Sequence, residues 1–174
     1  MKPIHLIFHA VKRPFVSAFI FFFTILFSNF LIGQASYFQM DPSISPDGKF
    51  VVFSYDGDLW KVDSEGGQAW RLTGMKGEET LPRISPDGKW IAFSASQYGN
   101  KDVYIMPILG GEIKQLTFHD AADDVDSWSW DSKQIYFTSS RSNRYSGYQV
   151  SIDGQTPVRL FDHYFNNVHN VVEH

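Results

Sequence analysis

Cysteine is absent from the 174-residue chain. A protein without cysteine has neither a disulfide framework nor a thiolate metal site, so both are excluded. The absence is compatible with any cellular compartment. Hydrophobic residues make up 43% of the chain, which is enough for one domain with a sizeable core.

Positive charge is scarce. The 15 Lys and Arg residues are outnumbered by 19 Asp and Glu residues, and the formal net charge is −4. Proteins that bind nucleic acids neutralise phosphates with clustered Lys and Arg. The composition therefore argues against a nucleic-acid partner.

The motifs of common catalytic and cofactor sites are also missing. The sequence contains no GxSxG nucleophile elbow and no HExxH zinc motif. The stretch GMKGEET, which begins at Gly74, lacks the Gly-Lys-Ser/Thr ending of a phosphate-binding loop. We therefore assign no catalytic residue, no metal ligand and no cofactor-binding residue, and we expect no cofactor.

Residues 1–35 form a separate unit. Three basic residues precede an uncharged run at 15–32, and the small residues Gly33 and Ala35 follow it. This order is typical of a secretory signal peptide and predicts cleavage after Ala35. An uncleaved membrane anchor is the alternative, because the run has the minimum length for a spanning helix. In both cases we expect residues 36–174 to be exported, to the periplasm or out of the cell, with membrane contact only through an uncleaved leader.

One turn sequence occurs three times. SPDGKF begins at Ser45, SPDGKW begins at Ser85, and a diverged copy, SWDSKQ, begins at Ser129. The first two copies are 40 residues apart and the last two are 44 apart. An internal period of about 40–45 residues is typical of the blades of a propeller.

Each repeat predicts four strands. SPDG suits a type I turn, because proline pre-sets φ, Asp bonds the local backbone and Gly ends the turn. The runs that follow it, FVVFS, WIAFS and QIYFT, are short and rich in β-branched and aromatic residues, as strands are. We therefore predict an all-β fold, a β-propeller fragment of four-stranded blades. The blades span about 41–73, 81–117 and 125–161, and the start of a further blade spans 165–174.

Three phenylalanines fix the register of these blades. Phe53, Phe93 and Phe137 each follow the Asp of the turn by six residues. We expect them to occupy equivalent buried positions on the second strand of successive blades. In the third turn Trp130 and Ser132 replace proline and glycine, so the motif does not predict the geometry of that turn.

The repeat resembles the TolB-type, WD40-like propeller repeat in its pattern P-x-I-S-P-D-G-K-W-I-A-F-S, followed by DVYIM, GGE and QLT. The stretch GNKDVYIMPILGGEIKQLTFH, residues 99–119, is more similar still to the N-terminal propeller of tricorn-like serine peptidases. This resemblance implies a larger parent in which a PDZ-like module and a serine peptidase domain follow the propeller. The matching residues include no catalytic residue of that family.

An acidic stretch, DAADDVD, is a candidate for calcium, which takes carboxylate oxygens as ligands. Its carboxylates belong to Asp120, Asp123, Asp124 and Asp126. The stretch lacks the glycine and the closing glutamate of an EF-hand loop. Because it lies between two predicted blades, we interpret it as a solvated loop.

Histidines and large aromatic residues have structural interpretations. His163, His169 and His174 lie in the tail without ligand spacing, and His119 lies at a predicted strand end. The aromatic residues recur at blade positions, so packing between blades is favoured over a ligand platform. They are Trp60, Trp90, Trp128 and Tyr104.

Two function classes remain open. Three blades are fewer than the four to eight of a typical closed propeller, so we expect an N-terminal portion of a larger protein. In the first class it is the non-catalytic propeller of an exported tricorn-like peptidase and guides or filters peptide substrates. Its partners are the remaining blades, the peptidase domain and peptide or protein ligands.

In the second class it is a TolB-like propeller that binds proteins and has no enzymatic activity. A propeller of the prolyl-oligopeptidase type is a weaker third alternative.

Overall fold

The computed structural model describes residues 41–142 and 144–161. All described residues belong to the second of the two units into which the chain divides, which spans residues 37–174. The predicted leader, the three tail histidines and the predicted further blade lie outside the described residues. Within these ranges all regular secondary structure is β-strand, so there is no helix that could cross a membrane.

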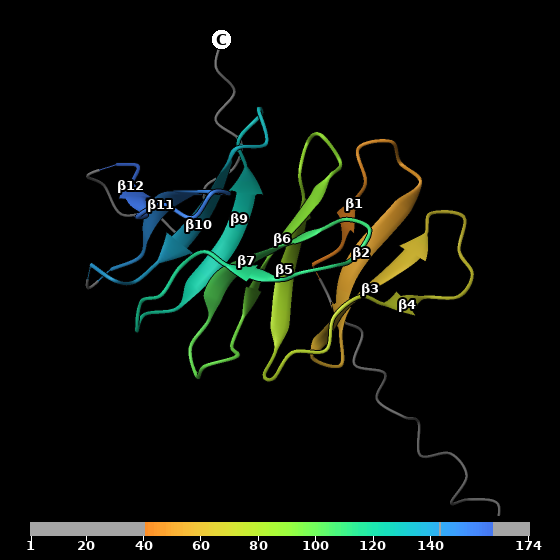
Figure 1. Cartoon of the computed structure of the whole chain (residues 1–174), viewed down its shortest axis with the longest axis horizontal. Helices are drawn as coiled ribbons and strands as arrows, with labels where there is room; N and C mark the ends of the chain where they lie inside the picture. Colours follow the sequence, from red (N-terminus) through yellow and green to blue (C-terminus); the bar gives the residue numbers. More distant parts are fainter. Residues whose placement is uncertain (1–40, 143, 162–174) are drawn as a thin grey trace, which may run out of the picture. The chain divides into compact units, whose positions relative to one another are not determined.

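Three four-stranded antiparallel sheets confirm the predicted all-β blades, and in each the strands follow chain order. The sheets lie one beside the next in Figure 1, coloured from orange for the first to blue for the last. Blade one contains β1 (Ser43–Ile44), β2 (Phe50–Tyr55), β3 (Asp58–Asp63) and β4 (Trp70–Arg71). Blade two contains β5 (Glu79–Ile84), β6 (Trp90–Ala95), β7 (Asp102–Pro107) and β8 (Lys114–Gln115). Blade three contains β9 (Asp123–Trp128), β10 (Gln134–Ser139), β11 (Ser146–Ser151) and β12 (Val158–Arg159).

The repeated turn joins the first and second strands of every blade. Gly48 and Gly88 donate backbone hydrogen bonds to the carbonyls of Ser45 and Ser85, at 2.8 and 2.9 Å. Both glycines have positive φ, 72° and 70°. Ser132 makes the equivalent bond at 3.0 Å and also has a positive φ of 61°. The third turn therefore keeps the geometry of the other two without their proline and glycine.

A side-chain network reinforces each turn. The Ser45 hydroxyl donates to Asp47 at 2.7 Å, and the Lys49 N–H donates to the same carboxylate at 3.2 Å. These two bonds lower the pKa of Asp47. Neighbouring turns are also connected, because the N–H of Asp87 donates to the hydroxyl of Ser132 at 3.0 Å.

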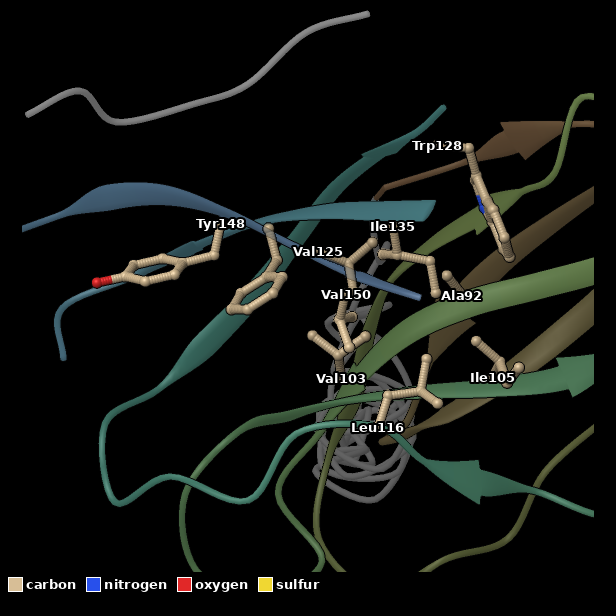
Figure 2. Packing of buried hydrophobic residues seen from close by; sticks show 10 residues of the cluster. Ala92, Val103, Ile105, Leu116, Val125, Trp128, Ile135, Tyr148 and Val150 are labelled. Atoms are coloured by element: carbon tan, nitrogen blue, oxygen red, sulfur yellow. The ribbon is translucent and has the colours of Figure 1, made fainter. Parts of the chain in front are cut away.

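The hydrophobic core lies between the blades. One cluster joins blades one and two, and includes Val52 and Leu59 on one side and Ile91 and Phe93 on the other. The second joins blades two and three, and Figure 2 shows its side chains converging from both sheets. Its buried members are Ala92, Val103, Ile105, Leu116, Val125, Trp128, Ile135, Phe137, Tyr148 and Val150. Each blade is therefore stabilised mainly by its neighbour, as in other repeat folds.

The three register phenylalanines occupy equivalent positions, opposite Trp60, Tyr104 and Tyr148 on the third strands. Phe93 and Phe137 are fully buried, and each stacks on its partner tyrosine with ring centroids 5.8 and 5.6 Å apart. Phe53 is only half-buried, so the prediction of burial is wrong there. Phe93 and Phe137 face the preceding blade, whereas Phe53 faces away from blade two.

Candidate functional site

The acidic stretch is not a solvated loop. Asp123, Asp124 and Asp126 lie in β9, the first strand of blade three, and only Asp120 is in a connection. Asp123 is fully buried. The loop prediction failed because burial here depends on a distant cation: the guanidinium of Arg141 forms an ion pair with Asp123.

A second carboxylate lies close to this ion pair. Asp102 is buried, and it accepts a hydrogen bond from the Thr117 hydroxyl at 3.3 Å. The same hydroxyl accepts the N–H of Val103 at 2.9 Å. Burial, followed by the charge of Asp123, raises the pKa of Asp102. The charges of Asp123 and Arg141 in blade three therefore both act on Asp102 in blade two.

A related arrangement lies between blades one and two. Glu79 is fully buried and accepts hydrogen bonds from the Thr73 hydroxyl and from the N–H of Met75. The Thr73 hydroxyl in turn accepts the N–H of Leu59 at 2.8 Å. Burial raises the pKa of Glu79. In both blades the threonine that ends the LT sequence accepts an N–H from the third strand and donates to a buried acid. For Thr73 this acid is Glu79 of the next blade, whereas for Thr117 it is Asp102 of the same blade.

His119 is the one histidine within the described ranges. Its Nδ1 accepts a hydrogen bond from the N–H of Ala121 at 3.0 Å, so the imidazole caps a local turn. In the same ranges no group of three or more His, Asp or Glu side chains is placed to hold a metal ion. The GMKGEET segment leads into β5 and contributes Glu79 to the buried network described above.

The recurring aromatic residues divide into two pairs. Tyr104 and Trp128 are buried in the clusters between blades, and the Trp128 indole donates to the Arg83 carbonyl at 2.8 Å. Burial raises the pKa of Tyr104 to about 12, so this phenol stays neutral. Trp60 and Trp90 are half-buried. Trp90 packs at the margin of the second cluster and also borders an open groove.

This groove lies between blades two and three and has a volume of about 340 Å³. Trp90, Ile105, Pro107 and Ile152 provide its apolar lining, and the remaining lining residues are Glu112, Lys114 and Asp153. The ammonium of Lys114 donates to the Ile152 carbonyl at 2.9 Å. An aromatic and aliphatic surface bordered by a few charged groups is the usual composition of a binding pocket.

Sequence reasoning interpreted Trp90 as a packing residue and missed the charged residues of the groove. Glu112 and Asp153 lie in the loops that follow β7 and β11, one on each blade. Only the packing of two blades brings them to one groove. A usable signal was present in the repeat alignment, where Lys61 of blade one is replaced by Ile105 in blade two.

Curated relatives share the repeat region. Tricorn protease homolog 1 of Streptomyces coelicolor is 34% identical over 91 residues, which are 52% of this chain and 8% of the relative. An uncharacterised protein of Agrobacterium fabrum is 29% identical over 139 residues, which are 75% of this chain and 46% of the relative. The chain thus spans less than half the length of either of these relatives.

Solved structures agree on the fold. TolB from Acinetobacter baumannii has a TM-score of 0.61 at 26% identity, and the match covers 75% of this chain and 34% of TolB. The crystal structure of the tricorn protease has a TM-score of 0.54 at 19% identity, and the match covers 66% of this chain and 14% of the protease. At this identity the second match shows the fold alone.

A family model describes most of the chain. The model of the tricorn protease N-terminal β-propeller domain matches residues 36–169, a range that contains every described strand. The matched range begins directly after the predicted leader. The structural match to TolB agrees with the TolB-type repeat that the sequence resembles. The chain has three blades built from one repeat, and the family model matches most of its length. It therefore belongs to the tricorn protease N-terminal β-propeller family.

Proposed function

We propose that the chain is the N-terminal, non-catalytic propeller portion of an exported tricorn-like serine peptidase, and that it guides or filters peptide substrates. The observation that carries this proposal is the family match over residues 36–169. The tricorn protease homologue, of which the matched segment is 8%, supports a large parent protein. The peptidase domain and the other blades of that parent are the proposed partners.

The roles of the turn serines support a non-catalytic propeller. The hydroxyls of Ser45, Ser85 and Ser129 each donate to the turn aspartate and accept the N–H that opens the next strand. His119, which could act as a base, bonds the backbone of its own turn. A nucleophile needs a neighbouring base to take its proton, and these residues are committed to turns instead.

The open face of blade one supports association with further blades. Ile44 is 63% exposed and Tyr55 is 42% exposed. On blade two the equivalent residues are Ile84 and Ala95, and both pack in the cluster shared with blade one. A further blade with the apolar pattern of blade one would cover this face in the same way.

Export is proposed from residues 1–35. Expression of the full chain in a bacterium should give an exported product that starts at Ser36, as determined by N-terminal sequencing. A membrane-bound product that starts at Met1 would establish the anchor instead.

A second candidate function is a protein-interaction module of the TolB type. The structural match to TolB, with its TM-score of 0.61, favours it. The two functions differ in the ligand, because a peptide filter recognises unfolded segments whereas an interaction module recognises a folded surface.

Fluorescence anisotropy distinguishes the two candidates. The full chain is titrated into a set of dye-labelled unstructured peptides, and then into folded proteins that carry the same segments in their structures. If the chain guides or filters peptide substrates, it should bind the free peptides and bind the folded proteins more weakly. Binding of folded proteins alone would reject the peptide role in favour of the interaction module.

A further inference from the structure

A cation–π contact lies on the side of blade one that faces blade two. The ammonium of Lys61 in β3 lies 4.0 Å from the centroid of the Phe50 ring in β2. Such a contact stabilises a cation because the face of the ring carries negative charge. Lys61 is only half-buried, so its aliphatic stem covers apolar surface while its head stays near water.

Strand pairing identifies the equivalent residues on blade two. Val52 pairs with Lys61, and Ala92 pairs with Ile105, which places Ile105 where blade one has Lys61. The residue that opens the second strand is Phe50 in blade one and Trp90 in blade two. The aromatic ring is therefore kept and enlarged, whereas the lysine is replaced by a shorter, neutral side chain.

The groove of about 340 Å³ lies at this substituted place, and both Trp90 and Ile105 line it. Its volume falls in the range of about 300–1,000 Å³ that is usual for small-ligand sites. Pro107 and Ile152 extend the apolar lining from the two blades. The comparison of blades one and two indicates that the groove corresponds to the space that the Lys61 side chain occupies in blade one.

The charges around the groove also favour a cation. Glu112 and Asp153 are both exposed lining residues, and neither takes part in an ion pair among the residues that the structure describes. Lys114 is the one positive lining residue, and the carbonyl of Ile152 holds its ammonium. Two carboxylates against one ammonium give the lining a net negative charge, which favours a positively charged ligand.

We propose that this groove binds the basic side chain, arginine or lysine, of an extended peptide. The aliphatic stem lies along Ile105 and Ile152, and the cationic head lies over Trp90 and pairs with Glu112 and Asp153. The preference for a cation is argued from the residues of the groove. That the cation belongs to a peptide rests on the function proposed above. One side chain at an open site binds weakly, with a Kd on the order of 1 mM.

Isothermal titration of the full chain tests the proposal. The probes are acetyl-Ala-Arg-Ala-amide, the same tripeptide with the neutral isostere citrulline, and acetyl-arginine-amide. We expect the arginine tripeptide to bind at least about fivefold more tightly than the citrulline tripeptide, because only the former carries the charge. Equal affinities would overturn the cation site.

Two variants locate the site. Glu112→Gln combined with Asp153→Asn should weaken the arginine tripeptide about fivefold or more. The matched control, Asp56→Asn combined with Glu65→Gln, removes the same charge from exposed positions of blade one and should leave the affinity unchanged. Equal losses in both double variants would show a non-specific charge effect and would overturn the assignment.

Ile105→Lys supplies the cation internally, as blade one does, and should abolish binding. Since Ile105 is buried, its unfolding temperature is measured in parallel, and the charge variants decide the question if this variant does not fold. Acetyl-arginine-amide separates the cation site from the peptide role. If it binds as tightly as the tripeptide, the cation site stands and the peptide as its carrier is rejected.

Discussion

At the scale of single residues, the turn glycine has a backbone role. Gly48 has a φ of 72°, and a Cβ added there would meet no atom within 4 Å. Gly48→Ala should therefore lower the free energy of unfolding by about 1 kcal/mol, through backbone conformation alone. Urea unfolding of the full chain measures this loss. Gly48→Asn is the control and should cost less, because asparagine tolerates the left-handed region. An alanine variant as stable as the parent would contradict this explanation.

Buried Glu79 predicts a specific pH dependence. Burial raises its pKa above the ordinary value of 4.5, so the folded protein holds this proton more tightly than the unfolded chain does. The stability contributed by the proton is present below pH 4.5 and is lost as the pH rises through the raised folded pKa. Glu79→Gln should remove this dependence.

The measurement compares urea unfolding of parent and variant at several pH values. The stability of the parent relative to Glu79→Gln should decline as the pH rises above 4.5. The neighbouring Glu78→Gln, at an exposed position, should show no such trend. A parent that gains stability over the glutamine variant with rising pH would contradict the assigned direction.

At the scale of strands, the three register phenylalanines predict unequal losses. Phe93→Ala and Phe137→Ala each remove a fully buried ring and should cost about 3–5 kcal/mol. Phe53→Ala removes a half-buried ring on the open face of blade one and should cost at most about 2 kcal/mol. Denaturant unfolding of the three variants measures this order. Three equal losses would contradict the difference between the faces.

The strands and turns could be predicted because their signals are local. A turn such as SPDG and the alternating run after it determine a hairpin within a dozen or so residues. The third turn shows how far the pattern extends, since Ser132 adopts the conformation of glycine and its hydroxyl accepts the N–H of Asp87. The resemblance to the tricorn family rested on the same local residues.

The sites could not be predicted in the same way because they combine residues that lie far apart in the sequence. Asp123 reads as a loop residue in sequence, yet Arg141 neutralises it from 18 positions further along the chain. The groove combines Glu112 with Asp153 from a different blade. Half-burial of Phe53 likewise depends on which faces a neighbouring blade covers. Contacts of this kind have no local pattern.

At the scale of the whole molecule, the open face of blade one predicts self-association. Exposed apolar surface that continues along a sheet is a site of association. Sedimentation velocity of the full chain should show mass increasing with concentration. Ile44→Glu combined with Tyr55→Glu should reduce the association, whereas Leu109→Glu, at an exposed position in a turn of blade two, should not. A concentration-independent monomer would contradict this prediction.

The central claim is that this propeller binds peptides and does not cleave them. Mass spectrometry of unstructured peptides incubated with the purified full chain tests it most directly. The account predicts that every peptide remains intact, because the turn serines are held by their aspartates and His119 by its own backbone. Cleavage that persists through further purification and is abolished by replacing a single serine of this chain would contradict it.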